Sequence, residues 1–197
     1  MSDTSAPYGF RPIRHPSGCI QARPYTIASG YAVNLFEGDP VKLVTAGTIQ
    51  LATSDGTRTG TTDTVDVLGV LAGVEYVDST GKPNISNYWP TGQVATEIVA
   101  WVYDDPETEY AVQADGSIAA TAIGDQADFV GFTAPGGSTQ TGRSLAQLDA
   151  TLVGAGTQAQ FRIIQLFDAV NNEWGDSFTD VIVQIAEHTY VAEKAAV

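Results

Sequence analysis

The sequence of 197 residues is poor in the side chains that build redox and metal sites. It has one cysteine, Cys19, and two histidines, His15 and His188. A single thiol excludes an intramolecular disulfide. Neither a Cys-x-x-Cys pair nor a His-Glu-x-x-His run is present, so the common zinc patterns are missing. We therefore expect no metal, no cofactor and a fold held together by its hydrophobic core.

Long apolar runs are missing as well. No stretch of 18 apolar residues occurs, which excludes the usual membrane-spanning helix. The first eight residues have neither the basic region nor the apolar region of a secretory signal. We expect a protein that is made in the cytoplasm and has no membrane partner.

Basic residues are scarce, with nine Lys and Arg against 23 Asp and Glu and a formal net charge of −14. Three of the nine, Arg11, Arg14 and Arg23, lie within residues 1–30, which hold only one acidic residue. The rest of the chain is therefore strongly acidic. A surface of this charge is repelled by phosphate backbones, so we expect no direct binding of nucleic acid.

No group of residues has the spacing of a known catalytic site. Ser144, His188 and Asp149 supply the residue types of a hydrolase triad, but Ser144 lacks the surrounding Gly-x-Ser-x-Gly motif. Gly154-Ala-Gly156 lacks the third glycine of a dinucleotide-binding loop. We predict that the chain has no catalytic residues and is not an enzyme.

One stretch concentrates negative charge: Asp104-Asp-Pro-Glu-Thr-Glu109 holds four carboxylates between two predicted strands. It lacks the ligand spacing and turn glycine of a calcium loop. Adjacent carboxylates in one turn also do not give the opposed geometry of a glycosidase pair. We expect an exposed acidic turn that tolerates neutralisation, with a partner-binding patch as the alternative.

The first 30 residues predict an extended N-terminal arm. Four prolines within residues 7–24 prevent a helix from persisting, because each lacks an amide donor and restricts the residue before it. Aromatic side chains between them are unusual for a disordered tail. The arm should therefore lie on its own body or on a neighbouring molecule. We regard it as a docking element that can be removed from a folded body, and its candidate partner-binding residues are Tyr8, Phe10, Arg11, Arg14 and Arg23.

From residue 31 onward the pattern favours a mainly β fold, a compact antiparallel β-barrel or β-sandwich with little helix. Short β-branched runs alternate with turn residues. We place strands at residues 41–44, 49–53, 67–77, 96–103, 110–114, 143–148, 160–167 and 180–185, polar loops at 53–64 and 130–142, and short helices at most at 119–122 and 186–197. We assign residues 31–197 to one β-rich body domain.

Three tryptophans keep another function open. Trp89, Trp101 and Trp174 are candidate platforms for a sugar ring, since aromatic side chains are both flat and amphipathic. A carbohydrate-binding β-module is therefore an alternative.

Five segments, spread over most of the chain, occur together in this order: Ala6–Gly18, Gly38-Asp-Pro-Val41, Val67–Tyr76, Gly142–Asp149 and Trp174–Val183. In combination they resemble the decoration proteins of tailed bacteriophages, which are also called cement or head-stabilising proteins. The order of these segments, together with the arm at the front of the chain, carries the similarity.

The resemblance implies a structural virion protein, made in the host cytoplasm, that sits on the outer capsid surface. Its partner would be the major capsid protein, and it would stabilise the head by bridging neighbouring capsid subunits. It also implies self-association, with a trimer favoured and a dimer as the alternative. Apolar runs at 67–77 and 98–103 favour self-association too, because they offer more hydrophobic surface than a thin β-domain hides. A head–tail or tail subunit is the alternative structural role.

Overall fold

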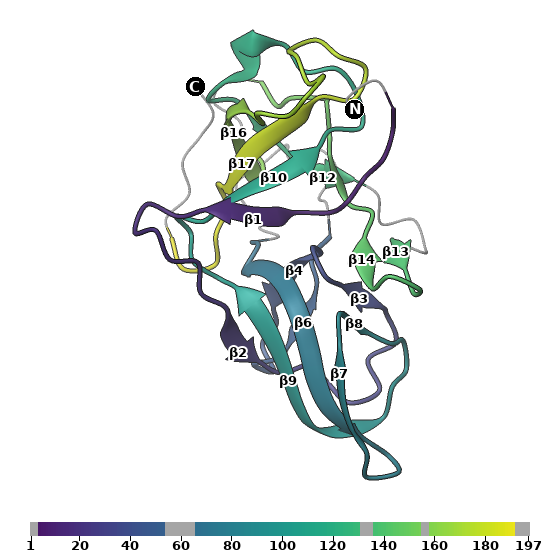
Figure 1. The fold of residues 1–197 in the computed structure, drawn as a ribbon. Coiled ribbons are helices and arrows are strands. Elements are labelled where there is room, and N and C mark those ends of the chain that lie inside the picture. Colours follow the sequence, from purple (N-terminus) through teal and green to yellow (C-terminus); the bar gives the residue numbers. More distant parts are fainter. Residues whose placement is uncertain (1–3, 54–65, 131–135, 155–157, 192–197) are drawn as a thin grey trace.

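The computed structural model describes residues 4–53, 66–130, 136–154 and 158–191. These residues form two lobes, one above the other in Figure 1. Every pairing between the named strands is antiparallel, and the arrangement resembles a sandwich. The predicted mainly β class is therefore confirmed. Among the described strands no closed barrel forms.

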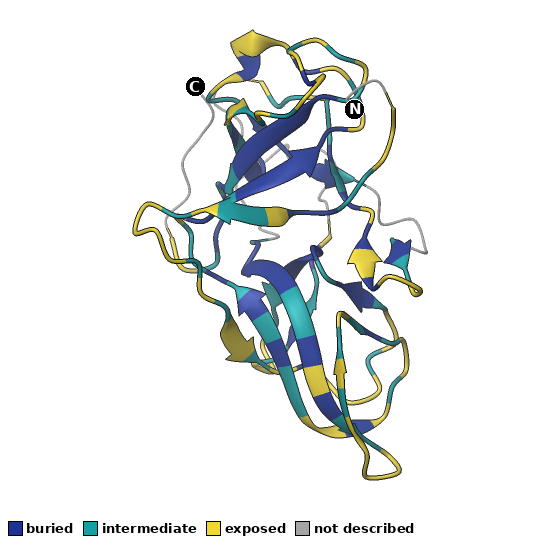
Figure 2. Cartoon of the chain, in the orientation of Figure 1, coloured by how far each residue is buried: buried dark blue, intermediate teal, exposed yellow. Residues whose placement is uncertain are grey.

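The first lobe contains a five-stranded sheet. Its strands, in spatial order, are β1 (Arg11–Arg14), β10 (Glu109–Gln113), β17 (Asp180–Ile185), β16 (Phe161–Leu166) and β11 (Gln126–Ala127). The two middle strands, β10 and β17, are buried along nearly their whole length (Figure 2). This explains why three successive residues in each strand, 110–112 and 181–183, are apolar rather than alternating with polar ones.

The second lobe contains a six-stranded sheet. Its strands are β2 (Arg23–Tyr25), β9 (Ala95–Tyr103), β6 (Gly69–Asp78), β4 (Pro40–Leu43) and β5 (Ile49–Leu51), with β7 (Pro83–Ser86) pairing with β6 beyond the end of β4. The long β6–β9 pair shifts register twice, between Leu71 and Gly73 and between Glu75 and Val77. Such irregularities increase the local twist of a strand pair.

Short strand pairs fill the space beside these sheets. They are β3 (Leu35–Phe36) with β8 (Tyr88–Trp89), β12 (Phe129–Val130) with β15 (Gln147–Leu148), and β13 (Gly137–Ser138) with β14 (Arg143–Ser144). A bridge between Glu37 and Arg143 joins the end of β3 to β14.

Helix is limited, in the described part of the chain, to one 3-10 turn at Ala120–Ala122, where a short helix was predicted. Residues 186–191 form bends and turns, so the helix predicted from residue 186 is wrong over this part, and its remainder lies outside the described residues. The predicted loops at 53–64 and 130–142 also lie largely or partly outside them. No described helix has the length and apolarity to cross a bilayer.

Most predicted strands are confirmed. The hairpin at 41–53 is β4–β5, and the runs beginning at residues 67, 96, 110, 160 and 180 are β6, β9, β10, β16 and β17. The strand predicted at 143–148 is instead broken into β14 and β15. The break occurs because the Ala146 amide donates to Ser144 Oγ (2.9 Å) and turns the chain there.

Each lobe has its own hydrophobic core. The first contains a ring cluster in which Phe10 stacks on Phe161 with centroids 4.3 Å apart, while Phe129 meets both rings edge-on. The second is built around Trp89, which Tyr76 contacts edge-on at 5.3 Å. The body beyond residue 31 thus has two cores rather than one.

β6 supplies side chains to both cores. Val70 belongs to the first core and its neighbour Leu71 to the second, because successive side chains of a strand point to opposite faces. The apolar run from Val67 to Val74 is therefore hidden inside a single chain. This run therefore does not provide the exposed hydrophobic surface from which self-association was predicted.

Candidate functional site: a cleft between the lobes

The N-terminal segment packs on its own chain, the first of the two predicted alternatives. Its strand β1 pairs with β10 in the first lobe, and its strand β2 pairs with β9 in the second. Phe10 is buried in the first core and Ile27 in the second. The segment therefore ties the two lobes together.

All basic groups of this segment except Arg11 face the acidic turn. Three contacts join them: Arg14 Nη2 to Glu109 Oε2 at 2.6 Å, His15 Nε2 to Asp105 Oδ1 at 3.1 Å, and Arg23 Nη1 to Asp104 Oδ2 at 3.4 Å. Part of the positive charge of the N-terminal segment is thus paired with carboxylates of the same molecule. The pKa of the Asp105 carboxyl is lowered, mainly because it accepts a hydrogen bond from the Glu107 amide and also through His15.

Asp104 is buried, at 2% exposure, which corrects the expectation of a wholly exposed acidic turn. It follows β9 directly, where β2 and the C-terminal residues both cover it. Tyr25 donates a hydrogen bond to its Oδ2 at 2.6 Å, and His188 Nε2 contacts its carbonyl oxygen at 2.9 Å. Glu107 remains exposed, as predicted for the turn.

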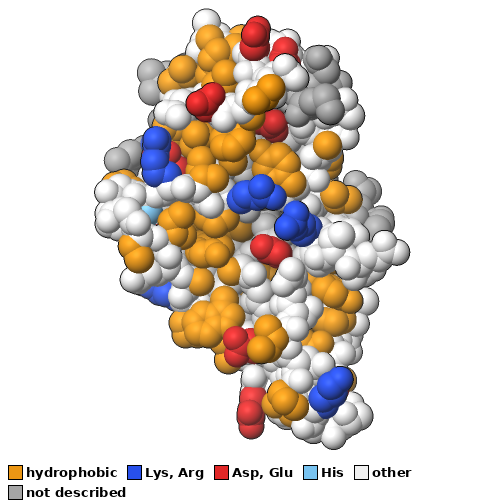
Figure 3. All heavy atoms as spheres, viewed as in Figure 1, with side chains coloured by type: hydrophobic (Ala, Val, Ile, Leu, Met, Phe, Trp, Pro, Cys, Tyr) orange, Lys and Arg blue, Asp and Glu red, His pale blue; other side chains and the backbone are white. Residues whose placement is uncertain are grey.

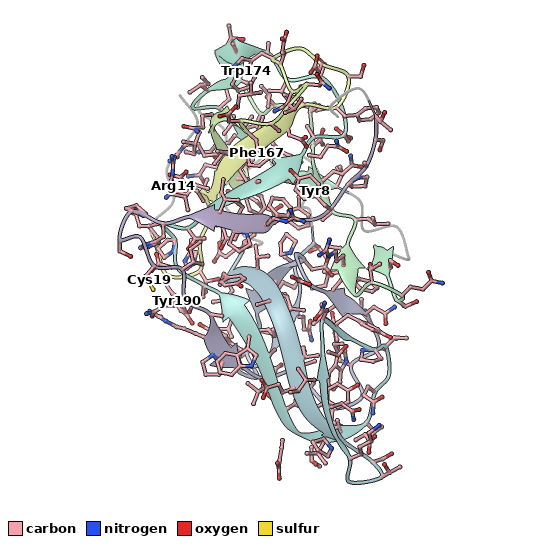
Figure 4. All side chains as sticks on the ribbon, viewed as in Figure 1. Tyr8, Arg14, Cys19, Phe167, Trp174 and Tyr190 are labelled. Atoms are coloured by element: carbon pink, nitrogen blue, oxygen red, sulfur yellow. The ribbon has the colours of Figure 1, made fainter. Side chains whose placement is uncertain are left out.

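The five candidate partner-binding residues fall into three groups. Phe10 is 1% exposed, so its selection as a contact residue is wrong: the ring fills the core. Arg14 and Arg23 bind carboxylates of their own chain. Arg11 is exposed, and its guanidinium carbon lies 5.3 Å from the centre of the ring of the half-buried Tyr8, whose hydroxyl donates to Asp180 Oδ1 at 3.4 Å. In Figure 4, Arg14 lies at the end of β1 and Tyr8 lies beyond its start.

A cavity of about 360 Å³ opens between the lobes beside Tyr8 and Arg11. Its wall combines parts of the chain that are far apart in sequence: Tyr8, Phe10, Arg11, Pro12, Glu37, Gly38, Leu71, Tyr103 and Arg143. Basic and acidic side chains lie next to one another near the middle of this face (Figure 3). We call this cavity the inter-lobe cleft.

Sequence reasoning missed Glu37, Tyr103 and Arg143 as site residues. No local motif marks them, because they meet only when the lobes pack together. The one available signal was the resemblance, whose second and fourth segments lie beside Glu37 and contain Arg143.

The backbone holds Glu37 and Arg143 on adjacent segments. The Glu37 amide donates to the carbonyls of Asn87 (2.8 Å) and Gly142 (2.9 Å), and the Ser144 amide donates to the Glu37 carbonyl at 2.9 Å. The two charged side chains therefore project from a fixed framework rather than from a free loop.

Gly9 allows the other wall to approach this framework. Its φ of +74° is costly for residues with a side chain, and an added Cβ would lie 2.6 Å from Ser144 Cβ. The left-handed backbone conformation at Gly9 separates a buried Phe10 from a half-buried Tyr8. This explains why the segment contributes one ring to the core and one to the cleft.

The electrostatics of the inter-lobe cleft are mixed. Neither Arg11 nor Arg143 forms an ion pair with a carboxylate among the described residues. Burial raises the pKa of Tyr103, and the negative charge of Glu37 adds to this rise. Behind Gly38, burial raises the pKa of Asp39 to about 7, although its Oδ2 accepts a hydrogen bond from the Phe36 amide at 2.7 Å.

A second, smaller cavity of about 140 Å³ lies at the loop between β1 and β2. Its lining includes His15, Cys19, Arg23 and the turn residues Asp104 and Asp105. Over the described ranges, no group of three or more His, Cys, Asp and Glu side chains has a geometry suited to a metal ion.

The residues considered for a triad have other partners. Ser144 Oγ accepts from the Ala146 amide, His188 bonds the Asp104 carbonyl, and Asp149 accepts from the Thr151 amide at 2.7 Å. These contacts give each side chain a local structural role.

Of the three tryptophans considered for sugar binding, one is inaccessible and two are partly exposed. Trp89 is fully buried, so it is not a surface platform. Trp174 packs against the first core. Trp101 is half-buried, and its indole N–H donates to Glu75 Oε1 at 3.0 Å.

Comparison of this chain with protein-family models, with curated proteins and with solved structures finds no match.

Proposed function

We propose that this chain is a structural virion protein that binds the outer surface of a tailed-phage capsid and bridges neighbouring capsid subunits. One observation carries the proposal. The segment that opens the resemblance to decoration proteins, residues 6–18, forms a wall of the inter-lobe cleft, where Arg11 is exposed and Tyr8 is half-buried.

These side chains suit a binding role. Tyrosine and arginine are over-represented among the residues that contribute most to protein interfaces. The stacked Tyr8 ring restricts Arg11, which lowers the entropy lost on binding. A clamp on a repetitive shell needs only modest contacts, because linked sites raise the overall affinity by about 10²–10⁴.

The charge distribution supports an oriented mode of attachment. With a net charge of −14, the molecule repels other anionic surfaces over most of its area. Arginines gathered at one cleft would favour approach through that face, since complementary charge steers encounter. On this proposal the capsid presents an acidic site to the cleft.

We also propose, from the resemblance, that the protein acts as a homotrimer at local three-fold positions of the shell, has no enzymatic activity and needs no cofactor. Light scattering at micromolar concentration should return about three chain masses. If the protein is a monomer in solution and forms trimers only on heads, assembly takes place on the shell. A protein that is monomeric both in solution and on heads would contradict the trimer.

The decisive experiment mixes the purified protein with expanded, empty heads that lack it. Saturable co-sedimentation, with added density between capsid subunits in electron micrographs, is the expected result. Protein that remains in the supernatant would overturn the proposal. Density confined to the portal or tail would instead assign the head–tail or tail role, and binding on a glycan array would support the carbohydrate-binding alternative.

A further inference from the structure

Two arginines without ion-pair partners meet at one cavity of a strongly acidic protein. Arg11 comes from β1 and Arg143 from β14, and both line the inter-lobe cleft. Both side chains are exposed, and neither contacts a carboxylate within ion-pair distance in the described part of the chain. By contrast, Arg14 and Arg23 already have carboxylate partners.

The tyrosines that line the cleft add accessible aromatic surface to this positive charge, and buried apolar side chains lie beneath them. Leu71 and Phe10 belong to the two cores, and Tyr8 and Tyr103 are half-buried. A volume of about 360 Å³ falls in the range of ligand pockets, ~300–1,000 Å³. The site is therefore sized for a few side chains of a peptide segment.

Glu37 decides between classes of anion. Its carboxylate lines the same cleft as the arginines. It would repel a nucleic acid backbone, in which every linkage is charged, as would the net charge of the chain. A peptide can place one carboxylate near the arginines and direct an amide N–H toward Glu37, because amide donors and carboxylate acceptors alternate freely along its length.

We propose that the inter-lobe cleft binds a short acidic peptide segment of a partner protein, with an Asp or Glu carboxylate placed between Arg11 and Arg143. Guanidinium groups match carboxylates geometrically and form stronger hydrogen bonds than neutral donors. An apolar residue beside the carboxylate would contact the half-buried rings of Tyr8 and Tyr103. The identification of the partner as a capsid subunit rests on the function proposed above. The preference of the cleft for an acidic peptide is independent of that function.

The test uses two capped peptides, acetyl-Ala-Glu-Leu-Glu-Ala-amide and its counterpart with Gln in place of both Glu residues. Binding to the full chain is followed by NMR through the arginine Nε–Hε signals and the backbone amides around Tyr8. The acidic peptide should shift the Arg11 and Arg143 signals saturably. The Gln peptide should bind at least roughly tenfold more weakly, the factor expected for loss of about 1.4 kcal/mol.

Variants locate the site. Arg11→Gln and Arg143→Gln should each weaken binding of the acidic peptide by roughly five- to tenfold, as expected for loss of a charge-assisted hydrogen bond. Arg14→Gln is the matched control, because it removes the same charge from the opposite end of the same strand (Figure 4). Circular dichroism spectra of all three should match that of the unchanged protein.

Three results would overturn the inference: equal binding of both peptides, equal weakening by Arg14→Gln, or saturable shifts with inorganic phosphate alone. Head binding separates this inference from the proposed function. If Arg11→Gln and Arg143→Gln bind heads normally, the cleft is not the contact although the protein is a decoration protein. If the acidic peptide binds and heads do not, the cleft assignment stands and the capsid role fails.

Discussion

The Tyr25 hydroxyl donates a hydrogen bond of 2.6 Å to Oδ2 of Asp104, which lies 79 residues further along the chain. Tyr25 belongs to the edge strand β2, and Asp104 is buried at the start of the acidic turn. Burial and then the Asp104 carboxylate raise the pKa of Tyr25. The pair therefore fixes the N-terminal segment to the turn, in addition to the backbone pairing of β2 with β9.

Removing this pair should destabilise the fold. We expect Asp104→Ala to lower the free energy of unfolding by about 2–4 kcal/mol, since it deletes a buried acceptor that binds Tyr25 and Arg23. Urea denaturation measures the change. A double-mutant cycle with Tyr25→Phe should give a coupling of roughly 1–2 kcal/mol.

Glu107→Ala provides the control within the same turn, because Glu107 is exposed. Its effect should stay within about 0.5 kcal/mol. Equal effects of Asp104→Ala and Glu107→Ala would mean that the turn is uniformly solvated, as the sequence alone suggested.

The N-terminal segment should be required for folding of the first lobe. Phe10→Ala should cost about 3–5 kcal/mol, because it empties a position stacked on Phe161 at 4.3 Å. Deleting residues 1–23 removes Phe10 together with strand β1, so the loss should be larger still. Thermal unfolding followed by circular dichroism tests both, with Val170→Ala at an exposed site as the control. A truncated chain that melts like the intact one would restore the idea of a removable arm.

Asp39 should make stability fall as the pH rises. Its pKa is about 7 in the folded chain and about 3.9 when unfolded, so between these values the folded state holds a proton that the unfolded state has lost. The stabilisation is fully present below about pH 4 and disappears as the pH rises through 7, with a slope of at most about 1.4 kcal/mol per pH unit. Asp39→Asn should flatten this part of the profile in urea titrations from pH 4 to 8. An unchanged slope would show that Asp39 is ionised throughout.

His188 should act in the opposite direction. Burial lowers its pKa below the usual 6.5, so the unfolded chain takes up a proton first and stability is lost as the pH falls below about 6.5. Its Nδ1 accepts from the Tyr190 amide (3.1 Å), which leaves the hydrogen on Nε2, facing the Asp104 carbonyl. Nitrogen-detected NMR should show this tautomer at pH 7 and a midpoint below 6.5. A protonated or Nδ1–H imidazole at pH 7 would contradict the assignment.

The sequence predicts the strands of this fold better than their assembly. Periodicity located β6, β9 and β17, because their apolar patterns report burial directly. Periodicity could not show that Val70 and Leu71 face different cores. A strand that packs between two cores has the same apolar sequence pattern as a strand buried within one core.

For a related reason, the sequence predicts only some of the residues of the candidate site. Tyr8 and Arg11 stand out because aromatic and basic residues are unexpected among prolines. Phe10 and Asp104 were placed on the surface because a local pattern does not reveal partners more than 70 residues away. For Asp104 those partners are Tyr25, Arg23 and His188, which arrive from both ends of the chain.

The shared strand β6 and the N-terminal segment give the molecule two parallel mechanical ties between its lobes. A force that pulled the lobes apart would load β6 and β9 along their length, and it would simultaneously have to peel β1 from β10 or β2 from β9. Such a frame resists hinge opening, so the distance between the two walls of the cleft is set during folding. In the capsid role that we propose, a molecule built in this way would transmit tension between its attachment points on the shell instead of opening under it.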